Sequence, residues 1–159
     1  MPSAVAGAKR GHKVTLFEGG DSIGGQFSIA SRIPGKEEFH ETLRYFKKKV
    51  ESTGVDLHLN TRVSVDDLAK GSFDEIILAT GIVPRTPAIP GIEHPKVIGY
   101  LDAILGRKPI GQTVAVIGAG GIGFDVSELI THRGESTSLS REAFWKEWGI
   151  DLALEARGG

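Results

Sequence analysis

Three glycines at fixed spacing, Gly118, Gly120 and Gly123, follow an apolar β-forming run in the segment Val114–Gly123. Apolar residues at helical spacing come directly after them, from Phe124 onward. Strand, glycine turn and helix in this order are typical of a site that holds a dinucleotide. The first glycine allows the tight turn, the second lets the pyrophosphate approach, and the third lets helix and strand pack closely. A glycine-rich loop without a ligand is the alternative, and the flanking strand and helix argue against it.

The second strand that completes such a motif is not found after it. A complete dinucleotide site has a second strand ending in Asp or Glu about twenty residues on, which holds the ribose hydroxyls. Here Thr131–Ser140 reads as a loop, and no β-run follows it. The motif therefore predicts a pyrophosphate cradle without its ribose acid.

An acid of the kind needed stands near the start of the chain. The short β-run Val14–Glu18 follows a helix-like segment, Ser3–Arg10, and precedes Gly24, Gly25 and Gln26. Glu18 is suited to accept hydrogen bonds from a ribose diol, although a solvent-facing glutamate at a strand end is the plain alternative. No glycine turn precedes Ser3, so the sequence is expected to begin inside the first helix of a nucleotide-binding unit.

Hydrophobic periodicity predicts an α/β fold, a Rossmann-like parallel sheet with helices on both faces. The further helices expected are Lys36–Thr53, a single turn at Val65–Ala69, one from Phe124, and Arg141–Trp148. The further strands expected are Val55–Leu59, Asp74–Gly81, Val97–Leu101 and Thr113–Ile117. Asp21–Pro34 is expected to be a loop, and Val83–Pro95, with four prolines, an extended crossover.

These elements suggest three parts. Residues 1–83 read as a partial nucleotide-binding domain without its first strand and glycine fingerprint. Residues 84–110 read as the proline-rich crossover, and residues 111–159 as the start of a second nucleotide-binding domain without its second strand.

Composition narrows the chemistry. The 159 residues include no cysteine, which rules out disulfides, thiolate catalysis and thiolate-bound iron–sulfur clusters within this sequence. The five histidines show no metal-binding spacing, so no metal site is expected. A net charge of −1 without a basic cluster argues against nucleic acid, and no apolar run is long enough to cross a bilayer. We expect a soluble, cytoplasmic protein.

Five stretches together carry a family resemblance: Phe17-Glu18, Ile23–Phe27, Ile33–Phe39, Ala79–Arg85 and Gly118–Asp125. The sequence resembles the bacterial type of 2,4-dienoyl-CoA reductase, of the NADH:flavin oxidoreductase group that also includes trimethylamine dehydrogenase. The likeness covers nearly the whole chain, and lies in the region that follows the catalytic TIM barrel in that family. It implies that residues 1–83 are a partial FAD-binding domain and residues 111–159 the start of an NAD(P)-binding domain. It implies an oxidoreductase of fatty-acid β-oxidation, in which hydride passes from NADPH to FAD and electrons continue through a 4Fe–4S cluster to FMN.

The resemblance also implies the contacts of each cofactor. Glu18 would hold the FAD ribose, Val63 would lie near the adenine, and the NADP(H) pyrophosphate would rest on the glycine turn. The complete set of implied cofactor-binding residues is Glu18, Gly24, Gly25, Gln26, Lys36, Val63, Ala79, Thr80, Gly81, Gly118, Gly120 and Gly123. No catalytic residue is expected, because FMN, the 4Fe–4S cluster and the barrel would bind or lie outside these residues.

Three functional readings follow. The first is a fragment of a flavin- and NAD(P)H-dependent oxidoreductase, inactive by itself and completed by the TIM barrel of its parent enzyme. The second is a module that binds ADP without a redox role, as in relatives of trimethylamine dehydrogenase. The third is a non-catalytic interaction domain.

The absent first strand leads to one structural hypothesis. Thr113–Ile117 could fill the vacant central place of the sheet, within the chain or from a second copy in a domain-swapped dimer. The strand order would then be Val55–Leu59, Val14–Glu18, Thr113–Ile117 and Asp74–Ala79.

Overall fold

The computed structural model describes residues 1–153, 155 and 157, and the chain forms two compact units. The first unit comprises Met1–Ser28 and His40–Pro87. The second comprises Ile29–Phe39 and Ala88–Gly159. The chain therefore enters the second unit, returns to the first and then enters the second again.

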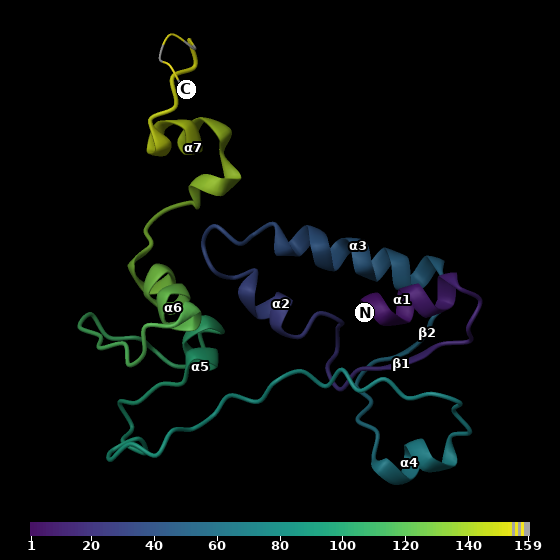
Figure 1. Ribbon diagram of the computed structural model, residues 1–159. Coiled ribbons are helices and arrows are strands. Elements are labelled where there is room, and N and C mark those ends of the chain that lie inside the picture. Colours follow the sequence, from purple (N-terminus) through teal and green to yellow (C-terminus); the bar gives the residue numbers. More distant parts are fainter. Residues whose placement is uncertain (154, 156, 158–159) are drawn as a thin grey trace. The chain divides into compact units, whose positions relative to one another are not determined.

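A parallel pair of short strands is the centre of the first unit (Figure 1). Strand β1 (Thr15–Phe17) follows helix α1 (Pro2–Lys9), and strand β2 (Asp56–His58) follows helix α3 (Phe39–Ser52). Leu16 lies opposite Leu57 in the register. Helix α2 (Gln26–Ala30) runs from the first unit into the second, and helix α4 (Val65–Lys70) follows β2.

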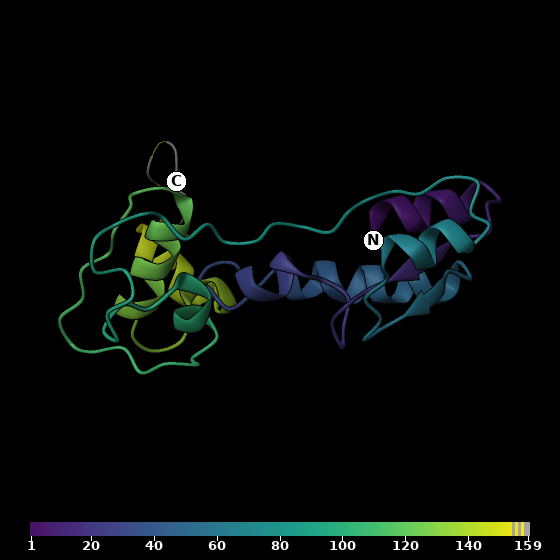
Figure 2. The same ribbon diagram turned by 90° about the horizontal axis from the view of Figure 1, so that it is seen from below.

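The core of the first unit lies on one face of this pair. Side chains of α1, α3 and the residue just before β2 form a buried cluster of Ala4, Val5, Val50 and Val55. Leu16 and Leu57 pack against this cluster, so both helices cover the same face, as Figure 1 and Figure 2 show. The apolar stripe of α3 explains its place, because Phe46 and Val50 are one turn apart and both reach the cluster.

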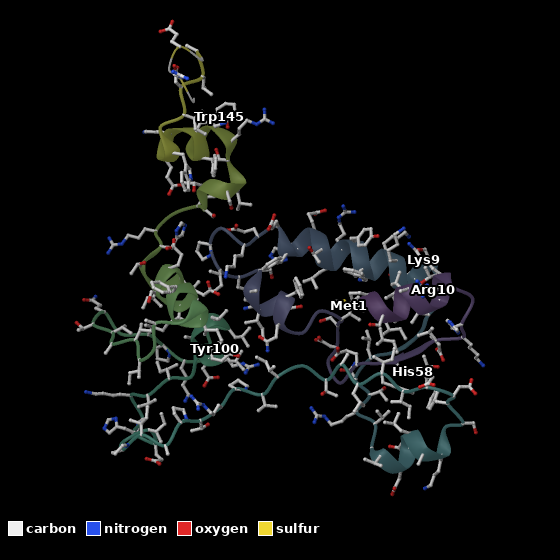
Figure 3. The ribbon with its side chains drawn as sticks, viewed as in Figure 1. Met1, Lys9, Arg10, His58, Tyr100 and Trp145 are labelled. Atoms are coloured by element: carbon white, nitrogen blue, oxygen red, sulfur yellow. The ribbon has the colours of Figure 1, made fainter. Side chains whose placement is uncertain are left out.

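The opposite face of the pair carries an aromatic contact. Phe17 and the neighbouring His58, labelled in Figure 3, have ring centroids 5.3 Å apart. Phe73, just after α4, packs edge to face against Phe17, with the two ring centroids 6.2 Å apart. This contact covers part of the face that no helix of the main cluster reaches.

Helices dominate the described part of the second unit. They are α5 (Tyr100–Ile104), α6 (Gly121–Thr131), the 3-10 helix η1 (Thr137–Leu139) and α7 (Arg141–Trp148). Helix α5 packs against α6, and Tyr100 lies at the start of α5 (Figure 3). The Ser140 side chain accepts from the Ala143 amide to cap α7, and Gly149 ends that helix in the left-handed conformation.

The five predicted helices and the first two predicted strands are confirmed, whereas three predicted strands are wrong. Asp74–Gly81 and Thr113–Ile117 form no strand, and α5 begins within Val97–Leu101. A β-run becomes a strand only when another backbone pairs with it, and β1 and β2 pair only with each other in the described part of the chain. Ile77 and Leu78, 72% and 76% exposed, show the consequence.

The predicted four-strand order within one chain is therefore wrong as well. The sheet of the described residues has the order β1-β2, and Thr113–Ile117 is not part of it. The predicted loop at Asp21–Pro34 also contains α2, which the absence of a clear apolar stripe concealed. Among the described residues, no helix is long and apolar enough to cross a membrane.

Candidate functional site

Glu18 stands where β1 ends, in a turn held by the second strand. Its amide donates to the His58 carbonyl at 2.9 Å, and its carbonyl accepts from the Thr61 amide at 2.9 Å. The Glu18 carboxylate accepts from the Gly20 amide at 2.8 Å. The carboxyl ends of the two strands therefore meet at one edge, which is where open α/β sheets bind ligands.

The segment that follows is shaped by two glycines. Gly24 has φ +135°, and a Cβ there would lie 2.3 Å from the Ser28 hydroxyl and 2.5 Å from a methyl of Leu43. Gly25 has φ +50° with open space around it, and Gln26 begins α2 with its side chain exposed. The chain at Gly24 thus passes too close to α3 for any side chain.

The remaining candidates of the first unit are less closely organised. Val63 is half-buried next to Ser64, the residue that caps α4. Ala79, Thr80 and Gly81 are exposed in the segment after α4, which forms no strand, with Gly81 at φ +77°. The structure puts all three in the unit that holds Glu18 and Gly24 but does not pair them with β1.

The late glycine turn has the geometry that its spacing predicts. Gly118 has φ +111°, Gly120 is the N-cap residue of α6, and a Cβ at Gly123 would lie 2.2 Å from the Gly118 carbonyl oxygen. A Cβ at Gly120 would meet no atom within 4 Å. The turn is closed where helix and preceding chain touch and open where a pyrophosphate would approach, so these residues fit a dinucleotide.

Lys36 belongs to the unit of this glycine turn, whereas Glu18 and Gly24 belong to the other. The Nζ of Lys36 lies 2.6 Å from Oδ1 of Asp125, which is two residues beyond Gly123. The side chains of Lys36 and Asp125 are 39% and 26% exposed. Sequence reasoning missed Asp125, because 89 residues separate it from Lys36 and nothing in their spacing connects them.

Polar contacts continue on both sides of Lys36. The Gly35 amide donates to the buried Ser136 hydroxyl at 3.1 Å, and the Ser138 hydroxyl donates to Glu37 Oε2 at 2.6 Å. Partial burial raises the pKa of Glu37, but hydrogen bonds from Ser138, its own backbone, Ser136 and Gly35 outweigh this effect and leave the pKa below its usual range. The carboxylate form of Glu37 is the one that these donors favour.

No cluster of three or more His, Asp or Glu side chains that could hold a metal ion is found among the described residues. The candidate residues described above offer backbone amides, the strand-end carboxylate of Glu18 and the ammonium group of Lys36.

A parallel strand–helix–strand unit with an acid at its ligand edge, together with a glycine turn that opens a helix, defines a Rossmann-like α/β protein of the dinucleotide-binding class. The model of the pyridine nucleotide-disulphide oxidoreductase family matches residues 1–143. The chain therefore belongs to that family of flavin- and pyridine-nucleotide-dependent oxidoreductases.

Several curated proteins are similar to it. A metal reductase of Desulforamulus reducens is 33% identical over 135 residues, which cover 82% of this chain and 20% of the relative. A cinnamate reductase of Clostridium sporogenes and an NADH oxidase of Thermoanaerobacter brockii are each 31% identical over 87% of the chain. The chain spans about a fifth of the length of these relatives.

A solved structure extends the likeness to three dimensions. A 2-naphthoyl-CoA reductase in complex with 2-naphthoyl-CoA superposes with a TM-score of 0.75 and 27% identity, over 92% of this chain and 24% of that one. The expected fold class, a Rossmann-like α/β arrangement, is thereby confirmed.

Proposed function

We propose that this chain is the dinucleotide-binding part of a reductase that takes electrons from NAD(P)H through FAD. The glycine turn carries the proposal: Gly123 admits no side chain, whereas Gly120 faces open space. That pairing of a tight and an open glycine is what a bound pyrophosphate requires. In this proposal NADP(H) binds at Gly118, Gly120 and Gly123.

FAD, in the same proposal, binds along the ligand edge of the first unit. Glu18 accepts hydrogen bonds from the ribose, and Val63 lies beside the adenine. Backbone of Gly24, Gly25 and Gln26 and of Ala79, Thr80 and Gly81 approaches the rest of the nucleotide. The two dinucleotides supply hydride transfer when bound, and the chain's own residues bind and orient them. We assign no catalytic side chain to these residues.

The reaction of the whole protein is proposed from its relatives. Names such as cinnamate reductase and 2-naphthoyl-CoA reductase support reduction of a conjugated carbon system, and the second supports a CoA thioester as the substrate class. A 2,4-dienoyl-CoA reductase-like activity in the cytoplasm fits both, with substrate, FMN and iron–sulfur cluster held in a TIM barrel beyond residues 1–159. The proposed domain division stays at 1–83, 84–110 and 111–159.

A second function, binding of ADP instead of FAD, keeps the same residues in use, because Glu18 would hold the ribose of either nucleotide. Titrating the chain with FAD and with ADP distinguishes them. Binding of FAD with an altered flavin absorption spectrum supports the redox role, whereas binding of ADP alone supports the second function.

The test of the pyridine nucleotide site is calorimetric titration with NADH and NADPH. We expect saturable binding that Gly120→Ala weakens at least about tenfold, because its methyl group would occupy the place of the pyrophosphate. Gly121→Ala is the matched control: its Cβ also meets open space, and alanine favours the helix. Equal binding by both variants would contradict the proposal.

A further inference from the structure

Three polar contacts attach the segment Gly35–Glu37 to the last part of the chain. Lys36 Nζ meets Asp125 Oδ1 at 2.6 Å, and the Gly35 amide and Glu37 carboxylate bond to Ser136 and Ser138. The partners are 89 to 101 residues apart in sequence and belong to the same compact unit. We call these three contacts the 35–37 clamp.

The Lys36–Asp125 pair of the clamp is partly sheltered, with side chains 39% and 26% exposed. Ile33 beside it is 2% exposed and Ser136 is 8% exposed. The pair Arg44–Glu41, in contrast, has side chains 74% and 67% exposed. Water screens a sheltered pair less, so Lys36–Asp125 contributes more to holding its segments together than an open surface pair does.

Asp125 is also coupled to the glycine turn through α6. It lies two residues after Gly123, whose Cα faces the Gly118 carbonyl at a distance that admits no Cβ. The Ser127 hydroxyl donates back to the Gly123 carbonyl at 2.8 Å, so this first part of the helix is internally braced. A displacement of Asp125 therefore moves the turn as well.

The charge of Asp125 alone would disfavour a ligand at this helix end. A carboxylate in the second turn repels a diphosphate bound at the N-terminus. Lys36 neutralises that carboxylate while its ammonium group stays partly exposed. The ion pair thus removes the repulsion between Asp125 and a bound diphosphate, and it also holds α6 in place.

We propose that Asp125 is a positioning residue: through Lys36 it clamps Gly35–Glu37 onto α6 and holds the glycine turn in its nucleotide-binding geometry. The inference rests on the proposed function for its effect on binding. The clamp itself is a property of the free chain, which allows the two to be tested separately.

The first measurement uses no ligand. Amide hydrogen exchange of the full chain is compared with that of Asp125→Asn and Lys36→Met. We expect exchange across residues 35–39 to rise about fivefold in both variants, as loss of a half-buried pair implies. Asp102→Asn is the matched control, because Asp102 lies in the same unit and forms ion pairs with Lys108, at 3.6 Å, and with Arg107, which are not clamp residues. Unchanged exchange in both clamp variants would overturn the inference.

The second measurement is a double-mutant cycle on NADH binding. We expect each single variant to bind about fivefold more weakly and the double variant no more weakly than either, because the two side chains act as one unit. Asp125→Glu should retain more affinity than Asp125→Asn. If Lys36 instead contacts phosphate directly, Asp125→Asn binds unchanged or more tightly, and the positioning role is overturned.

The two measurements separate the hypotheses. Raised exchange in a chain that binds neither NADH nor NADPH before mutation would overturn the proposed function and the effect on binding, and would leave the clamp standing. Additive losses in the cycle would overturn the coupling between Lys36 and Asp125.

Discussion

The glycines of this chain differ in what a single methyl group would meet. At Gly123 and Gly24 it would collide with atoms less than 2.6 Å away, whereas at Gly120 and Gly121 it would enter open space. The fold of the free chain therefore requires glycine at residues 123 and 24. A Cβ at Gly120 meets no atom in the free chain, so the fold does not require glycine there, whereas the proposed pyrophosphate site would.

At the residue scale, Gly123→Ala should destabilise the second unit by about 1–3 kcal/mol, because its Cβ would press on the Gly118 carbonyl. Urea unfolding followed by circular dichroism measures the loss. Gly121→Ala, two residues earlier in α6, should be neutral or stabilising. Equal stability of the two variants would show that the turn relaxes freely.

Gly24→Ala should lower the free energy of unfolding of the first unit by a similar amount, about 1–3 kcal/mol. Its Cβ would meet Ser28 and Leu43, and φ at this residue is +135°. Gly25→Ala is the comparison, since its φ of +50° costs only the left-handed penalty of about 1–2 kcal/mol without a collision. Thermal melts of both variants measure the difference, and a smaller loss at Gly24 would contradict the close approach to α3.

At the scale of the element, α4 depends on a reciprocal cap. The Ser64 hydroxyl accepts from the Asp67 amide at 3.2 Å, and Asp67 Oδ2 accepts from the Ser64 amide at 2.9 Å and from its hydroxyl at 2.7 Å. These bonds, the backbone one first, lower the pKa of Asp67. The helix is only six residues long, so its persistence rests heavily on this cap.

The cap should weaken in acid. The folded pKa of Asp67 lies below the unfolded value of about 3.9, so its stabilisation is complete above that pH and is lost as pH falls through the folded pKa. An NMR titration that follows the Asp67 carboxyl group measures its pKa in the folded protein. The pKa of Asp67 should be higher in the Ser64→Ala variant, and an identical pKa in both proteins would contradict the cap.

The comparison of sequence and structure is clearest for these elements. Val14–Glu18, Val55–Leu59 and Arg141–Trp148 could be predicted because their patterns are local, or because the partner strand is the next one along the chain. Asp74–Gly81 and Thr113–Ile117 have equally good β-patterns, but pairing depends on a neighbour that the pattern does not reveal. The glycine turn could be predicted from spacing, whereas Asp125 could not, because the fold alone brings it to Lys36.

At the scale of the whole molecule, the unpaired apolar segments should cause self-association. Val114 and Val116 are 45% and 40% exposed in a segment that pairs with no strand of the described residues, and exposed β-forming segments recruit other chains. We expect light scattering after gel filtration to show a concentration-dependent dimer, with Thr113–Ile117 of one copy beside β1 of the other.

Charged residues in that segment should abolish the dimer. The double substitution Val114→Asp and Val116→Asp should leave a monomer, whereas Val65→Asp, at an 82% exposed residue of α4, should not affect it. A chain that stays monomeric at every concentration would rule out the domain-swapped arrangement.

The interleaving of the two units has a consequence for synthesis and for gene rearrangement. Ile29–Phe39 leaves the ribosome before residues 40–87, yet its packing partners come after them. The second unit therefore cannot close while the chain is still growing through the first. Dividing the gene at residue 88 would separate Ile33 and Lys36 from the rest of the second unit. Recombination that exchanges only the later unit would separate the two halves of the clamp, so we expect viable exchanges to carry both segments together.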